Sequence, residues 1–133
     1  MPVLAYMGGS PRRVRFVGSS RRDLGEFPDG VRRDAGLALF EVQVGQMPES
    51  AKPLKGYGGA GVQEIVVGHA SGTFRVVYSI SLPDAVYVLH AFQKKSTSGL
   101  KTSQRDIDLI KRRLAEAQRL SAEYLSAESK ERT

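Results

Sequence analysis

The chain has 133 residues with 41% hydrophobic and 26% charged side chains, a composition typical of one compact globular domain. Basic residues exceed acidic ones by 20 − 14 = 6, which gives a pI near 9.8 and favours a polyanionic partner, with nucleic acid as the first candidate. The lack of cysteine excludes disulfides and thiolate metal sites. No segment has the length and apolar character of a signal peptide or a membrane-spanning helix. The protein is therefore predicted to be cytoplasmic, without a membrane partner.

The first predicted elements are a strand and a pair of helices. Residues 1–12 are expected to be flexible, and RVRFVGSS at 13–20 is predicted to be a strand. Ser20 and Asp23 then form the S-x-x-D pattern of a helix start, and Pro28 favours a second helix beginning there. This second helix has an apolar inner face made of Val31, Ala35, Ala38 and Val42.

A loop and three strands are predicted next. The segment from Gly45 to Gly61 is rich in proline and glycine and is expected to be a loop that carries Lys52 and Lys55. After it the chain is poor in charge and rich in β-branched and aromatic residues as far as Phe92, which is typical of a buried sheet. Short SG and LPD turns predict an antiparallel meander, with strands at 62–70, 73–81 and 85–93.

The last predicted element is a long amphipathic helix. Ser103 and Asp106 repeat the S-x-x-D pattern at its start. Apolar residues recur at helical spacing and predict packing on the sheet: Ile107, Ile110, Leu114, Ala117 and Tyr124. They accompany a basic face of Lys111, Arg112, Arg113 and Arg119. Residues 128–133 are expected to be a frayed tail, so that 13–127 form a single domain.

Together these elements predict an α+β fold in the order strand, helix pair, three-stranded antiparallel meander and C-terminal helix. With TFRVVY, then VYVLHAFQKK and then a helix start of the form K-T-x-x-x-D-I, the chain resembles the RelE/ParE toxin superfamily. Within it, the chain resembles most the HigB-like, phage-derived branch. The likeness covers Arg13 to Ala127 and implies a RelE-like fold and a toxin of a type II toxin–antitoxin system.

The resemblance also implies an activity and a set of partners. Toxins of this kind cleave messenger RNA on the translating ribosome with basic side chains on the sheet, and they use neither a metal nor a cofactor. The chain is therefore expected to be a ribosome-dependent, metal-independent endoribonuclease. Its implied partners are the ribosome, messenger RNA and a cognate helix-turn-helix antitoxin, with operator DNA bound only through the antitoxin. The basic charge of the chain suits an acidic antitoxin segment.

Arg75 is the first candidate catalytic residue. Cleavage of RNA by its own 2′-OH needs a group that takes the proton and cations that stabilise the charge growing on phosphorus. Strand alternation places Arg75 opposite Phe74 and Val76, and the resemblance implies that this arginine faces the phosphate, so we expect a surface-facing cation. The alternative is an arginine paired with Glu64 on a neighbouring strand.

The end of the last strand supplies three further catalytic candidates. Lys94 and Lys95 point to opposite faces, so only one reaches the active face, and the alternative for either is a solvated strand end. His90 is the third, because histidine has a reference pKa of about 6.5, which suits proton transfer. Alternation puts His90 on one face with Val88, Phe92 and Lys94, and this apolar company favours a satisfied core histidine as the alternative.

Four other residues are candidates for RNA binding: Lys52, Lys55, Tyr57 and Lys101. The three lysines can contact phosphates, and Tyr57 can stack on a base. The alternative for Tyr57 is to fill the underside of the Gly-rich loop that carries it.

One residue departs from the pattern of the superfamily. Relatives read E-I/L-R-V/I in the first meander strand, whereas this chain has Val66 in place of the phosphate-facing arginine. This departure, with the lack of an obvious general base, keeps a second hypothesis open. The protein is then a non-catalytic binding module, either a ParE-like toxin acting on gyrase or a degenerate toxin that binds only antitoxin and nucleic acid.

Overall fold

The computed structural model describes residues 10–57, 61–94 and 102–132, and these residues form an α+β fold, as predicted. In chain order its elements are β1 (Arg13–Phe16), α1 (Ser20–Gly25), α2 (Asp29–Gln43), β2 (Ala51–Pro53), β3 (Val62–His69), β4 (Gly72–Ser79), β5 (Ala85–Lys94) and α3 (Gln104–Arg132).

The strands form one mixed sheet in the order β1-β5-β4-β3-β2. The central part is the predicted antiparallel meander, in which β3 pairs with β4 and β4 with β5. At one edge β1 runs parallel to β5, and at the other edge β2 runs antiparallel to β3. Strand β1 is therefore the neighbour of the strand that comes last in the sequence.

The short strand β2 corrects the prediction that Lys52 lies in a loop. Only three residues of β2 pair with β3. Pro53 has no N–H, but its nitrogen faces away from β3, because neighbouring residues of a strand point their N–H groups to alternate sides. The hydrogen bond to β3 is made by the next residue, whose backbone nitrogen, Leu54 N, donates to Val62 O at 3.0 Å. Lys52 is therefore held on the sheet, while Lys55 lies in the turn that follows.

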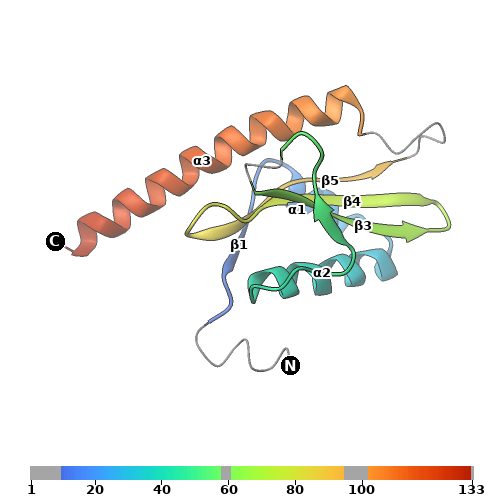
Figure 1. Ribbon diagram of the computed structural model, residues 1–133, viewed down its shortest axis with the longest axis horizontal. Helices are drawn as coiled ribbons and strands as arrows, with labels where there is room; N and C mark the ends of the chain where they lie inside the picture. The colour runs from blue at the N-terminus through green and yellow to red at the C-terminus, as the bar shows by residue number, and fades with distance from the viewer. Residues whose placement is uncertain (1–9, 58–60, 95–101, 133) are drawn as a thin grey trace.

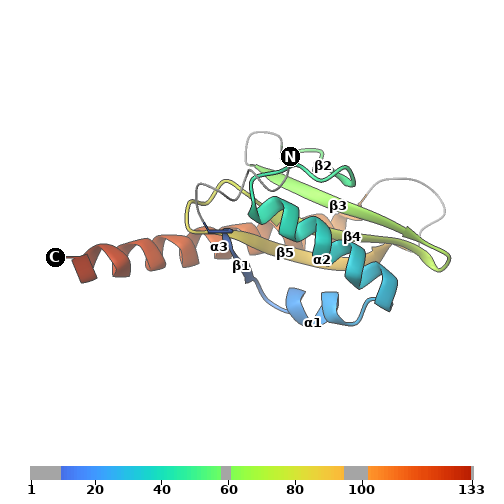
Figure 2. The same ribbon diagram turned by 90° about the horizontal axis from the view of Figure 1, so that it is seen from below.

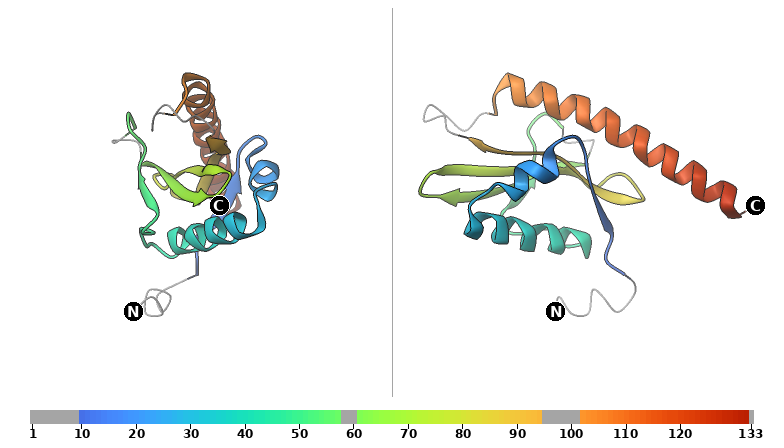
Figure 3. Two further views of the ribbon diagram at one scale, coloured as in Figure 1. Left: turned by 90° about the vertical axis from the view of Figure 1, so that its right-hand side faces the viewer. Right: turned by 180° about the vertical axis from the view of Figure 1, so that it is seen from behind.

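The helices cover both faces of the sheet, so that the molecule has three layers (Figures 1 and 3). Helices α1 and α2 pack on one face over a core that includes Val31, Ala35, Ala38, Val42, Ile65, Val76, Tyr78 and Val88. Helix α3 packs on the other face over a second core that includes Val17, Val62, Val77, Tyr87, Leu89, Ile110 and Ala117. The predicted apolar face of the second helix is confirmed, because all four of its residues are buried.

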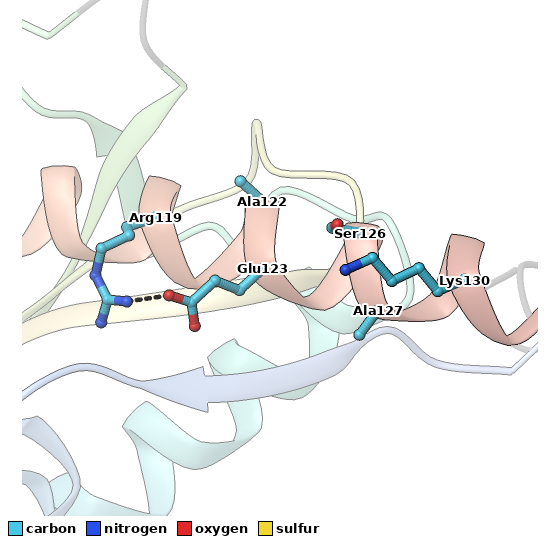
Figure 4. Close-up of a pocket in the computed structure, with 6 residues that line it drawn as sticks. All are labelled: Arg119, Ala122, Glu123, Ser126, Ala127 and Lys130. Atoms are coloured by element: carbon cyan, nitrogen blue, oxygen red, sulfur yellow. Dashed lines mark hydrogen bonds and ion pairs between the residues drawn. The ribbon is translucent and has the colours of Figure 1, made fainter.

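Helix α3 begins as predicted and runs further than predicted. The Asp106 N–H donates to Ser103 Oγ at 3.2 Å, as the S-x-x-D pattern requires. The helix passes Ala127, where the domain is predicted to end, and continues to Arg132. Its C-terminal part extends beyond the edge of the sheet (Figures 1 and 2). The exposed side of this part is drawn in Figure 4 and carries Arg119, Ala122, Glu123, Ser126, Ala127 and Lys130.

A β-bulge shifts the register between β4 and β5. Val77 is opposite His90, but the next residue, Tyr78, is opposite Val88. The expectation that Val88 shares a face with His90 is therefore wrong, because Val88 belongs to the core under α2. Leu89 is the extra residue and belongs with the α3 core, and from His90 onward the alternation is restored.

The turn between β4 and β5 is fastened to β1 and α3. The buried carboxylate of Asp84 accepts hydrogen bonds from Ser121 Oγ at 2.5 Å and Tyr87 Oη at 2.8 Å, and it pairs with Arg13 at 3.4 Å. Burial alone raises the pKa of Asp84, but these hydrogen bonds and the positive charge of Arg13 outweigh it, so that the pKa is lowered.

Arg12 holds the same turn through its guanidinium. It belongs to the segment 1–12 that is expected to be flexible, of which residues 1–9 lie outside the described residues. The Arg12 side chain donates to three backbone oxygens of the turn region, those of Ile80, Leu82 and Ala85, at 3.3, 2.5 and 2.9 Å. Arg12 is therefore an ordered part of the fold.

Candidate nucleic-acid interface

The face of the sheet that is turned toward α3 carries charged side chains from four strands: Lys52, Glu64, Arg75 and Lys94. Lys52 is opposite Glu64, and Arg75 lies between Val66 on β3 and Phe92 on β5. Residues directly opposite each other, or two apart on one strand, project from the same face. We call these four residues the charged cluster, and its formal charge is 3 − 1 = +2.

Arg75 is buried and paired, so the expectation of a surface-facing cation is wrong. Only 4% of Arg75 and 3% of Glu64 is exposed, and Arg75 Nη1 donates to Glu64 Oε1. The alternative of pairing with the neighbouring strand is therefore the one that the structure contains. The reason is its central position, because a cation flanked by strands on both sides needs a counter-charge once it is removed from water. Arg75 Nε is also buried and has no hydrogen-bond partner among the described residues.

Lys94 and Lys52 are the more accessible cations of the charged cluster. Lys52 is exposed on β2, and Lys94 is half-buried at the end of β5. Partial burial lowers the pKa of Lys94, and the positive charges of Arg75 and Lys52 lower it further, while Glu64 acts in the opposite direction. The four side chains therefore interact electrostatically, and the two lysines present their charge to solvent above the buried pair.

His90 is held against α3 by Asp106. His90 Nε2 and Asp106 Oδ1 are 2.7 Å apart, and the imidazole stacks on Phe92 with ring centroids 4.4 Å apart and planes at 16°. Asp106 Oδ2 accepts a second hydrogen bond from Ser103 Oγ at 2.7 Å. His90 Nδ1 is buried without a partner among the residues that the structure describes. The geometry fixes the orientation of the ring and leaves one ring nitrogen unused.

Asp106 and Glu64 are the residues of this region whose roles the sequence only partly indicates. The S-x-x-D pattern assigns Asp106 to the helix cap, and a carboxylate has a second oxygen that the cap does not use. That oxygen reaches His90 because α3 begins directly above β5. For Glu64 the signal is its isolation, since an acidic residue in an apolar strand needs a partner.

The remaining RNA-binding candidates are spread over several environments. Lys55 is exposed in the turn after β2. Tyr57 is half-buried against the α3 core, and its hydroxyl donates to Ile107 O at 3.4 Å. Burial and the nearby charge of Asp108 raise the pKa of Tyr57. Its position favours packing over base stacking. Lys95 and Lys101 lie outside the described residues.

The described ranges contain neither a cluster of metal ligands nor a helix that could span a membrane. Within 10–57, 61–94 and 102–132, no three His, Asp or Glu side chains gather so that they could hold a metal ion. In the same ranges, no helix is both long enough and apolar enough to cross a membrane.

Comparison with known proteins identifies the family. No curated protein matches the chain. The fold is similar to a solved structure of the toxin–antitoxin complex RelBE2 from Mycobacterium tuberculosis, with 24% sequence identity and a TM-score of 0.46, over 64% of this chain and 100% of that chain. The family model described as "Phage derived protein Gp49-like (DUF891)" matches residues 22–115, which is more than half of the chain. The chain therefore belongs to the family of Gp49-like phage-derived proteins.

Proposed function

We propose that the protein is the toxin of a type II toxin–antitoxin system, of the HigB-like branch, and that it cleaves messenger RNA on the ribosome in the cytoplasm without a metal. The observation that carries this proposal is the charged cluster, whose net positive charge lies on a rigid sheet where β5 ends. A preorganised group of cations of this kind can stabilise the charge that grows on a phosphate during transfer.

We assign different roles to the members of the charged cluster. Lys52 and Lys94 reach solvent and contact the phosphate directly, while Arg75 contributes its charge from beneath them. Lys94 also suits proton transfer, because its lowered pKa enlarges the fraction of neutral amine near neutral pH. His90 remains a second candidate for that step, with Nδ1 as the nitrogen not engaged by Asp106.

Inducible expression of the protein, followed by mapping of messenger RNA ends, tests this proposal. We expect growth arrest and new 5′ ends within reading frames for the wild type. Lys94→Ala is expected to slow cleavage about a hundredfold, because removal of one transition-state charge contact costs about that factor. Lys130→Ala, on the part of α3 that extends beyond the sheet, is the matched control and should cleave like the wild type. Equal cleavage by Lys94→Ala and the wild type contradicts the assigned site.

A second function is favoured by three observations. Arg75 is neutralised by Glu64, Val66 occupies the position where the resemblance implies a second arginine, and His90 is engaged by Asp106. Together they favour a non-catalytic binding module that acts on gyrase or retains only antitoxin and nucleic-acid contacts. The same expression experiment separates the two functions, since new DNA breaks or bound but uncut RNA replace new messenger RNA ends.

The proposal also includes a partner, a helix-turn-helix antitoxin through which operator DNA is bound. If the gene lies beside a short frame for such a protein, co-expression should give a stable complex. Separate elution of the two proteins at micromolar concentration contradicts the pairing.

A further inference from the structure

A groove runs along the side of the molecule that faces away from α3. It lies between α2, the segment before β2 and the last part of β3, with a volume of about 430 Å³. Figure 2 shows α2 beside β3. We call it the α2–β3 groove, and its lining includes Asp34, Leu37, Glu41, Glu49, Val67 and Gly68. Leu37 is 61% exposed although it is a large aliphatic residue, and it lies on the rim of an otherwise charged surface.

The charge of the groove is opposite to that of the whole chain. Asp34, Glu41 and Glu49 come from two separate segments, and none of the three forms an ion pair with another described residue. No lysine or arginine is among the described residues that line the groove. In a chain of net charge +6, three unpaired carboxylates around one hollow produce a local field that attracts a cation.

The edge of β3 that borders the groove is open. β2 pairs only with residues 63–65, and the last bond on this side is from Val66 N to Ser50 O at 3.0 Å. β3 continues to His69, and in the described part of the chain no strand lies beside this extension. An extended peptide can therefore hydrogen-bond along this edge.

We propose that the α2–β3 groove binds an extended segment of the antitoxin that carries a lysine or arginine next to an aliphatic residue. The aliphatic side chain covers Leu37 and Val67, and the cation lies among the three carboxylates. The net charge of the protein favours an acidic partner segment, but recognition at this site is decided by the local charge. This inference rests on the proposed function, because it takes the partner to be the antitoxin.

Overlapping peptides that cover the antitoxin sequence test the inference. Their binding to the full chain is measured by fluorescence anisotropy. We expect the tightest peptide to be basic and to contain an aliphatic residue. Leu37→Lys and Glu41→Lys should each weaken its binding about tenfold or more, because one loses apolar contact and the other places like charges together. Leu125→Lys and Glu131→Lys on α3 are matched controls at exposed positions and should bind like the wild type. Circular dichroism and Tm of each variant verify that it folds.

Three results overturn the inference: failure of every peptide to bind, tightest binding of an acidic peptide, and unchanged binding by Leu37→Lys and Glu41→Lys. A dimer in light scattering that Leu37→Lys dissociates also overturns it, because the groove is then occupied by a second copy. Messenger RNA cleavage by the chain alone is measured separately. Intact cleavage without groove binding removes only this inference, and groove binding without cleavage removes only the endoribonuclease activity.

Discussion

Arg75 and Glu64 are a buried pair, and this determines how a change at either residue must be interpreted. Removing one member of such a pair leaves an uncompensated charge in the interior, whereas replacing both with apolar residues of similar volume is often close to neutral. From the sequence alone, Arg75→Ala removes a surface cation and leaves the fold intact. In the structure the same substitution affects stability first.

We expect Arg75→Ala to lower the free energy of unfolding by about 3–5 kcal/mol, because the Glu64 carboxylate is left buried and unpaired. This is a large part of the about 5–15 kcal/mol that stabilises a typical domain. The double variant Arg75→Met with Glu64→Leu should recover most of the loss. Urea unfolding of the three proteins measures both effects. If Arg75→Ala unfolds at the wild-type urea concentration, the pair is not buried in solution.

The contact of Asp106 with His90 leads to a second prediction at the level of residues. Asp106→Ala is expected to destabilise the protein by about 1–3 kcal/mol, because it leaves His90 Nε2 unpaired and removes the oxygen to which Ser103 Oγ donates. Asp106→Asn keeps an oxygen that can accept from Ser103 Oγ and should lose less. The ¹⁵N shifts of the His90 ring report the tautomer and should change in Asp106→Ala. Unchanged ring shifts would show that Asp106 does not orient the histidine.

At the scale of elements, the strongly patterned segments are predictable and the weakly patterned ones are not. The apolar face of α2, the meander and the start of α3 follow from periodicity, turn residues and a cap, which are local signals. β2 has only three residues, one of which is a proline, so it has no period to detect. The bulge at Leu89 is equally invisible, because alternation assumes an uninterrupted register.

The network around Asp84 joins three elements and should make their association depend on pH. Because the pKa of Asp84 is lowered by folding, its stabilising contribution is present above the unfolded-state pKa of about 4 and is lost as the pH falls through the folded-state pKa. Asp84→Asn should therefore lose less stability than the wild type when the pH is lowered from neutral into that range. The comparison is made by urea unfolding at each pH.

Asp29→Asn is the control for this acid dependence. Asp29 pairs with Arg32 in the first turn of α2, but its side chain is 85% exposed, so this ion pair contributes little to stability. The Asp29→Asn protein should follow the wild-type pH profile. If Asp84→Asn also follows it, the Asp84 network does not link β1, the β4–β5 turn and α3 through its charge.

At the scale of the whole molecule, the two faces of the sheet differ in charge. The charged cluster makes the α3-facing side cationic, whereas the α2–β3 groove on the other side is acidic. A sequence reports only the sum of these charges, and strand alternation tells which residues share a side without telling which side is covered. This is why the sequence left the pairing of Arg75 with Glu64 as one of two alternatives, and why it did not indicate the acidic groove.

Salt dependence tests the contact of the cationic side with RNA. The proposed function predicts that affinity for 2′-O-methyl RNA, which cannot be cleaved by its own 2′-OH, falls steeply with salt as counterions are released. Lys52→Ala should reduce the slope of log K against log salt by about 0.7, the value for one phosphate contact on a single strand. Lys130→Ala should leave the slope unchanged. A slope that is equally insensitive to both substitutions places the RNA elsewhere on the protein.

The position of β1 beside β5 has a consequence for the order of folding. The hydrogen bond from Arg15 to Tyr87 spans 72 residues of sequence, so we expect β1 to add to the sheet after β4 and β5 have paired. Arg12, next to β1 in the sequence, stabilises the position of β1 through its hydrogen bonds to the backbone of the β4–β5 turn region. Arg12→Ala is therefore expected to accelerate unfolding in stopped-flow experiments and to leave the refolding rate almost unchanged. The N-terminal strand is then the part of the sheet that separates first and controls the lifetime of the folded protein.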